Sequence, residues 1–123
     1  MKTIQTVVAE GGDLSAALAG APMPDAALVL AFGDISRFCD ATMVGQLRAA
    51  YPEAILAGCS TAGEISGDGV STGTLCITAV SFGGTTLKHA VTRIGNMSDS
   101  QAAGRRLGEA LAAPDLKGVL VYG

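Results

Sequence analysis

The stretch Ala26-Ala27-Leu28-Val29-Leu30-Ala31-Phe32 is continuously apolar, and it decides the fold class. Turn-forming residues bound it on both sides, with Pro24-Asp25 before it and Gly33-Asp34 after it. An apolar run of this length between turns is typical of a strand that is buried on both faces. We therefore expect an α/β domain, in which helices cover such a strand.

A second apolar run leads into a turn of small and polar residues. Ala54-Ile55-Leu56-Ala57 predicts a short buried strand, and Gly58-Cys59-Ser60-Thr61-Ala62-Gly63-Glu64 follows it directly. Asp40 is a good N-cap for a helix over 41–51 that Pro52 ends. Met43, Val44 and Leu47 fall at helical spacing and predict the buried stripe of that helix.

Further strands and helices are predicted on both sides of these segments. They are a strand over 4–9, a helix over 14–20 capped by Asp13, a strand over 74–82 joined by a Gly83-Gly84 turn to a partner strand over 86–94, a helix from a capping box at Ser98 and Gln101 through Leu111, and a last buried strand over 117–122. The fold class we expect is α/β, with a mixed, mostly buried sheet, helices on its faces and one β-hairpin. Since nothing follows the last strand to cover it, we expect residues 1–123 to be an incomplete domain.

Composition narrows the range of partners and compartments. The chain has 123 residues and a net charge of −3. Charged residues make up only 15% of it, below the typical share of about 25%. This low share suggests that a partner domain or subunit covers some of the surface. An acidic chain with scattered basic residues disfavours nucleic acid and anionic membranes as partners. No apolar run approaches the ~20 residues that a bilayer span needs, and the N-terminus lacks a secretory signal. We therefore expect no membrane association and a cytoplasmic location.

The polar turn after the second strand is the best candidate for a binding site. Gly58 and Gly63 allow positive φ and a close approach to the main chain. The hydroxyls of Ser60 and Thr61 could line a polar pocket at the strand end, and Glu64 closes the segment. The loop over 64–73 is turn-rich, and it is either a flap over a ligand or a simple connection.

Catalysis at this turn is the weaker alternative. Gly58-Cys59-Ser60-Thr61-Ala62 is similar to the G-x-S-x-G nucleophile elbow, but Ala62 stands where the second glycine belongs. A serine triad also needs a base, and His89, the only histidine, falls inside a predicted strand. Because free cysteines are mostly buried, a structural Cys59 is favoured over a nucleophile. We expect no enzyme, with a hydrolase dependent on Cys59 or Ser60 as an alternative.

Cofactor and metal sites find little support in the residues. Cys39, Cys59 and Cys76 are odd in number and lack C-x-x-C spacing, which argues against disulfides and zinc. No phosphate-binding motif is present, and no lysine lies between Lys2 and Lys88. A lone His89 does not exclude haem, which needs only one strong axial ligand, although an ordinary strand histidine is favoured. We expect no cofactor, with haem as the alternative.

The sequence resembles the N-terminal part of the FIST (F-box and intracellular signal transduction) domain. The residues that carry the resemblance are Leu28 to Gly33, followed by a helix, and then Ile55 to Ile65, which includes the G-C-S-T-A-G-E run. The resemblance implies a sensory, ligand-binding module found beside histidine kinases, cyclic-dinucleotide enzymes and chemotaxis receptors. It implies amino acids as ligands, haem-based nitric oxide sensing in some members, and a C-terminal FIST half that this chain lacks.

The expected function is therefore a cytoplasmic sensory domain that binds a small, amino-acid-like ligand and passes its occupancy to an effector. Its partners would be the C-terminal FIST half and an effector such as a histidine kinase or a cyclic-dinucleotide enzyme. We assign hydrogen bonding to Ser60 and Thr61, and contact with a ligand ammonium to Glu64. The full ligand-binding set is Phe32, Gly58, Cys59, Ser60, Thr61, Gly63 and Glu64, with Phe32 as an apolar wall; no catalytic or metal-binding residue is expected.

Overall fold

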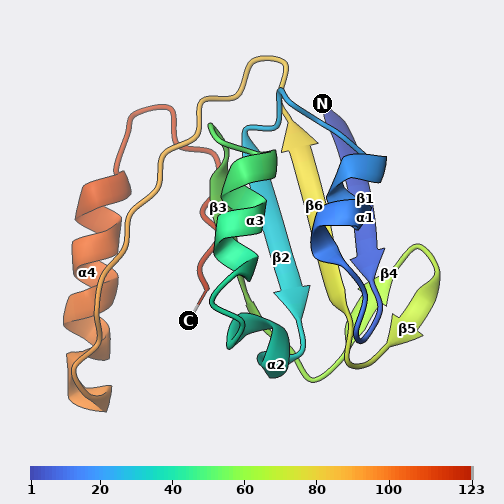
Figure 1. Cartoon of the computed structure of the whole chain (residues 1–123). Helices are drawn as coiled ribbons and strands as arrows, with labels where there is room; N and C mark the ends of the chain where they lie inside the picture. Colours follow the sequence, from blue (N-terminus) through green and yellow to red (C-terminus); the bar gives the residue numbers. More distant parts are fainter. Residues whose placement is uncertain (123) are drawn as a thin grey trace. The chain divides into compact units, whose positions relative to one another are not determined.

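The computed structural model describes residues 1–122 and divides into two compact units (Figure 1). The first unit comprises residues 1–85 together with Tyr122, and the second comprises residues 86–121. The elements of the first unit are β1 (Lys2–Val8), α1 (Leu14–Gly20), β2 (Leu28–Gly33), α2 (Ile35–Phe38), α3 (Met43–Ala50), β3 (Ile55–Ser60), β4 (Glu64–Ser66), β5 (Gly69–Ser71) and β6 (Leu75–Ser81). The second unit contains a short 3₁₀ helix η1 (Met97–Asp99) and α4 (Ser100–Leu111).

The main sheet of the first unit is mixed, as expected. Its strand order is β1-β6-β2-β3, so β2 and β6 are the interior strands. β2 and β3 are parallel, whereas β6 runs antiparallel to both β1 and β2. A separate two-stranded antiparallel sheet is formed by β4 and β5. The α/β class with a mixed sheet, helices and one hairpin is confirmed.

Helices cover one face of this sheet, which we call the helix face (Figure 1). Val29 and Ala31 of β2 are buried there with Leu18 of α1 and Leu47 of α3. The second face carries the alternate side chains of each strand because successive residues of a strand point to opposite sides. On β2 these are Leu28, Leu30 and Phe32, and all are only half-buried. The prediction that this strand is buried on both faces is therefore wrong for its second face.

The first helices form close to their predicted positions. Asp13 caps α1, and its Oδ1 atom accepts a hydrogen bond from the Ala16 backbone N–H at 3.2 Å. α3 is shorter than predicted, because Asp40 closes a turn onto Thr42 at 2.8 Å instead of capping the helix directly. Val44 is exposed, contrary to the predicted stripe, and α2 was not predicted.

The predicted hairpin at Gly83-Gly84 is wrong. Residues 86–94 form no strand, because β6 already exchanges backbone hydrogen bonds with β1 on one side and β2 on the other. The hairpin of this fold lies instead in the segment 64–73, for which the sequence predicts a loop. There Ile65 pairs with Val70 across a turn that ends at Gly69, with φ +115°.

Two predictions in the second unit also differ from the structure. α4 has no capping box, because the Ser98 hydroxyl and N–H both donate to the side chain of Asn96, two residues earlier. Ala103 is buried, whereas Leu107 and Leu111 are half-buried. Residues 117–122 form no strand, because an apolar run becomes a strand only when its backbone pairs with another, and it pairs with none in the described chain.

Candidate functional site

The ends of several strands meet at one edge of the main sheet, which we call the carboxyl edge. β1, β2 and β3 all run in one direction, so Val8, Gly33 and Ser60 lie at the same end, with Leu75 beginning β6 beside them. The chain leaves this edge toward both faces. After β2 it enters α2, whose Phe38 packs against the core of the helix face. After β3 it reaches the β4–β5 hairpin, which bonds to Gln5 on the second face through the Gly67 N–H at 3.0 Å.

β3 is longer than predicted and takes up part of the polar turn. Gly58, Cys59 and Ser60 continue the parallel pairing with β2, opposite Ala31, Phe32 and Gly33. The Thr61 N–H extends this ladder by donating to the Gly33 carbonyl at 2.8 Å. The turn itself therefore begins only at Thr61.

Glycine at position 58 is required by the approach of two strands. Gly58 has φ +146°, and an added Cβ would lie 1.8 Å from the carbonyl oxygen of Ala31. No side chain fits at that distance, so β2 and β3 pack here through main chain alone. Gly63 has no positive φ, and an added Cβ would meet the Ser71 carbonyl oxygen at 3.3 Å.

Glu64 is a buried carboxylate with hydrogen bonds on both oxygens. It is 3% exposed. The Thr61 hydroxyl donates to Oε1 at 2.7 Å, and Thr74 donates to Oε2 through its hydroxyl at 2.5 Å and its N–H at 3.3 Å. The Thr74 hydroxyl, followed by the Thr61 hydroxyl, holds the pKa of Glu64 below its usual value, against the opposing effects of burial and the Asp34 charge. The ionised side chain thus ties the start of the hairpin to the start of β6.

The two hydroxyls of the predicted site differ in what they can offer a ligand. Ser60 is exposed at the carboxyl edge on the helix face, and its hydroxyl makes no hydrogen bond to another described residue. The Thr61 hydroxyl already donates to Glu64. A ligand ammonium at Glu64 would compete with the two threonines, so Ser60 is the more available group.

Phe32 and Cys59 lie side by side in register on the second face of the sheet. The Phe32 ring packs against Tyr122 with ring centroids 5.7 Å apart and a tilt of 57°. Cys76 is the other neighbour of Phe32 in register, and burial, then the Glu64 charge, raises the pKa of its thiol. The predicted set is therefore divided, with Phe32 and Cys59 on one face and Ser60 on the other.

A small polar cavity of about 130 Å³ opens at the carboxyl edge on the helix face. Its lining includes Arg37, Asp13, Asp40 and Leu75. The Arg37 guanidinium bonds the carbonyl of Ala9 and reaches that of Gly12 at 3.5 Å, which uses two of its N–H donors. None of the seven predicted ligand-binding residues lines this cavity. The two charged residues Arg37 and Asp40, shortly after an apolar strand, are the signal that could have identified it.

His89, the only histidine of the chain, is the candidate haem ligand among these residues and the candidate base of a serine triad. His89 is exposed, lies outside any helix or strand and lines neither of the cavities described here. Haem is held by an axial ligand inside an apolar pocket, so these residues do not fit a haem site. His89 also belongs to the second unit, so the first unit, with Cys59 and Ser60, contains no imidazole that could act as a base.

Residues 1–122 contain neither a cluster of metal ligands nor a membrane-spanning helix. No group of three or more His, Cys, Asp or Glu side chains in this range is placed to hold a metal ion. None of the helices in the same range has the length and apolar character to cross a bilayer.

Comparison with known proteins identifies the family. The family model described as the FIST N domain matches residues 27–123, which include the β2–β3 pair and the hairpin. No curated protein and no solved structure matches the chain. The family is consistent with a sensory domain of signal transduction. Because the match covers well over half of the sequence, the chain belongs to the FIST N domain family.

Proposed function

We propose that this chain is the sensory module of a cytoplasmic signalling protein and binds a small ligand at the carboxyl edge of its sheet. The observation that carries the proposal is the divergence of the chain after β2 and β3, toward the helix face and toward the second face. In open α/β sheets, ligands bind in the crevice that forms where neighbouring strand connections leave in opposite directions. The exposed Ser60 hydroxyl and the charged cavity around Arg37 lie along this edge.

The ligand class we propose is a free amino acid. Such a molecule carries a carboxylate and an ammonium group, and the cavity at the carboxyl edge offers both complementary charges. Arg37 retains free N–H donors for a carboxylate, since its fork has five and two are used. Asp13 and Asp40 present carboxylate oxygens from the start of α1 and from the turn before α3. To Ser60, at the end of the neighbouring strand pair, we assign a hydrogen bond to a polar side chain of a ligand that extends from the cavity along the edge.

The output of the module would pass through the β3–β4 connection. Thr61 is bonded to Gly33 of β2 through its N–H and to Glu64 through its hydroxyl. A ligand that shifts Ser60 therefore acts on a side chain that anchors the β4–β5 hairpin. Differential affinity for two positions of this hairpin is sufficient to couple binding to a conformational change. The receiving partners would be the C-terminal FIST half and an effector such as a histidine kinase or a cyclic-dinucleotide enzyme.

Isothermal titration calorimetry of the purified chain tests the site and the ligand class together. Alanine, serine, glutamate and lysine are titrated as free amino acids into the native chain and into Ser60→Ala and Asp40→Asn. A hydrogen bond to a charged group contributes about 1.5–3 kcal/mol, so Asp40→Asn should weaken binding by roughly 10- to 100-fold. Ser60→Ala should weaken it by about fivefold or more.

Asp115→Asn is the matched control, because Asp115 is exposed and lies outside the first unit. It should leave the affinity unchanged. Equal affinity in the native chain and both edge variants would place the ligand elsewhere. The absence of heat with all four amino acids would reject the ligand class.

A further inference from the structure

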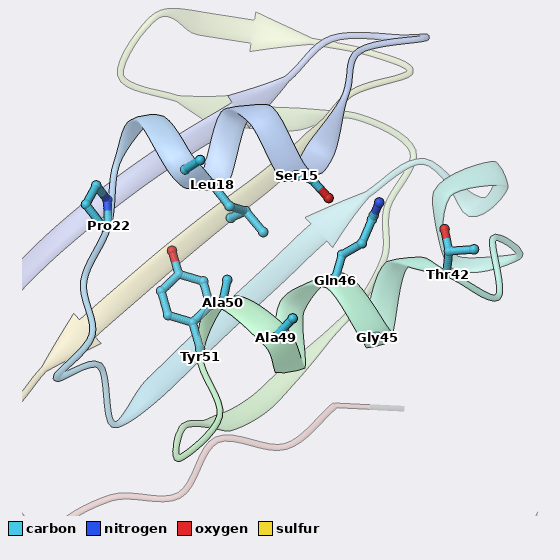
Figure 2. A pocket seen from close by; sticks show the side chains of 10 residues that line it. Ser15, Leu18, Pro22, Thr42, Gly45, Gln46, Ala49, Ala50 and Tyr51 are labelled. Carbon is cyan, nitrogen blue, oxygen red and sulfur yellow. The ribbon is translucent and has the colours of Figure 1, made fainter.

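A second hollow of the first unit lies between α1 and α3, and the proposed sensory function does not use it (Figure 2). Its volume is about 620 Å³, within the range of roughly 300–1,000 Å³ that small-molecule sites occupy. Its walls are mostly apolar, and Leu18, Ala19, Pro22 and Ala49 contribute to them. None of the residues that line it carries a charge. We call it the α1–α3 groove.

Tyr51 is a buried polar side chain that opens into this groove without a partner. The residue is 3% exposed, yet its hydroxyl makes no hydrogen bond to another described residue. Among residues 1–122, every fully enclosed side-chain nitrogen or oxygen has a hydrogen-bond partner, so this hydroxyl must keep a narrow opening to the groove. In Figure 2 the phenol points toward Leu18 and Pro22. The hydroxyl has no partner among the described residues, and an acceptor placed in the groove would take its hydrogen.

Gly45 lines the groove from inside α3, where glycine is unfavourable for the helix. A glycine inside a helix destabilises it by about 1 kcal/mol relative to alanine. No heavy atom lies within 4 Å of a Cβ added at Gly45, so no close packing contact explains the missing side chain. The position lines the groove, where a side chain would occupy the space that a ligand needs.

Polar side chains also line the groove in addition to Tyr51. Ser15, Thr42 and Gln46 contribute neutral hydroxyl and amide groups, which both donate and accept hydrogen bonds (Figure 2). A charged ligand would meet no opposite charge on these walls. The lining therefore selects a neutral molecule with an apolar body and polar groups.

We propose that the α1–α3 groove is a binding site for a small, uncharged, mostly apolar molecule that carries a hydrogen-bond acceptor, such as an aliphatic ketone, ester or amide. The acceptor takes the free hydrogen of the Tyr51 hydroxyl, and the apolar body lies on Leu18, Ala19 and Ala49. The site is separate from the charged cavity at the carboxyl edge, which shares only Gln46 with it.

Heteronuclear NMR titration of the full chain with methyl heptyl ketone tests this site. We expect saturable shifts of backbone amides in α1 and α3. Tyr51→Phe, which removes only the hydroxyl, should weaken binding by about fivefold. Gly45→Leu should abolish it by filling the groove, and it should still fold, because leucine is a better helix former and its Cβ meets no atom. Nonanoate, which has the same chain length but a negative charge, should bind at least tenfold more weakly.

The chain offers a matched control for each variant. Tyr122→Phe removes a hydroxyl outside the groove, and Gly104→Leu adds the same side chain in α4, where a Cβ also meets no atom within 4 Å. Both should leave the affinity for the ketone unchanged. Shifts that do not saturate, or that persist in Gly45→Leu, would overturn the proposal. The amino acid titration does not bear on this result, since its ligand is charged and its variants lie outside the groove.

Discussion

Gly58 of β3 lies so close to Ala31 of β2 that a Cβ at position 58 would stand 1.8 Å from the Ala31 carbonyl oxygen. The two strands are parallel, and they carry Ser60 and Gly33 to the carboxyl edge two positions further on. The closeness of the strands at Gly58 thus sets where the exposed Ser60 hydroxyl and the Thr61 N–H emerge from the sheet.

Gly58→Ala is expected to destabilise the first unit severely. The new methyl group would overlap backbone rather than a movable side chain, and the residue would keep a strained φ of +146°. We expect a loss of more than about 3 kcal/mol in the free energy of unfolding, measured by urea denaturation. Gly45→Ala is the control, and it should be neutral or stabilising by up to about 1 kcal/mol, because its Cβ meets no atom. Equal midpoints for the native chain and Gly58→Ala would contradict the strand geometry.

Glu64→Gln is expected to loosen the β4–β5 hairpin. The amide keeps the shape of the side chain but presents an NH₂ group to one of two donors, Thr61 or Thr74, where the carboxylate accepted from both. One unsatisfied buried donor costs about 1–3 kcal/mol, so limited proteolysis should cut the segment 64–73 faster. Glu53→Gln, at an exposed position, should leave the cleavage rate as it is in the native chain. An unchanged rate in Glu64→Gln would show that the carboxylate does not anchor the hairpin.

Acid should destabilise the first unit partly through Glu64. Its pKa is lower in the folded chain than in the unfolded chain, so the unfolded state binds the proton first as pH falls. The stabilising contribution is therefore complete above about pH 5 and is lost as pH drops below the usual glutamate pKa of about 4.3 toward the folded value. Urea midpoints measured between pH 6 and about pH 3 should fall less steeply for Glu64→Gln than for the native chain. Parallel curves would show that Glu64 has the same pKa in both states.

Arg106 is expected to hold the second unit together. It donates to Asp99 through two nitrogens at 3.0 and 3.2 Å, to the Thr92 hydroxyl at 2.9 Å and to the Arg93 carbonyl at 2.9 Å. Arg106→Ala should therefore speed hydrogen exchange in α4 and η1. Arg105→Ala, at the adjacent exposed position, is the control and should leave exchange unaltered. Equal exchange rates in the two variants would show that the hydrogen bonds of Arg106 do not stabilise α4 and η1 in solution.

Several features of the fold were predictable because they depend on local chemistry. The apolar run at 26–32 produced β2, and Asp13 capped α1, because capping and burial are decided within a few residues. The G-C-S-T-A-G-E run also led to the family that the comparison identifies. The hairpin could not be located in this way. Gly83-Gly84 is a good turn signal, but β6 has β1 and β2 on its two sides and no free edge for the next segment.

The candidate site shows the same division between sequence and tertiary structure. The sequence by itself determined that a polar, glycine-bearing segment follows a buried strand, because the apolar run and the polar run each consist of consecutive residues. Only the tertiary structure decided that Glu64 bonds Thr74, that Arg37 lies in a cavity with Asp13, and that Tyr51 opens into a groove between two helices. Hydrogen bonds and cavities form between side chains that are distant along the chain, and a pattern of neighbouring residues does not predict such contacts.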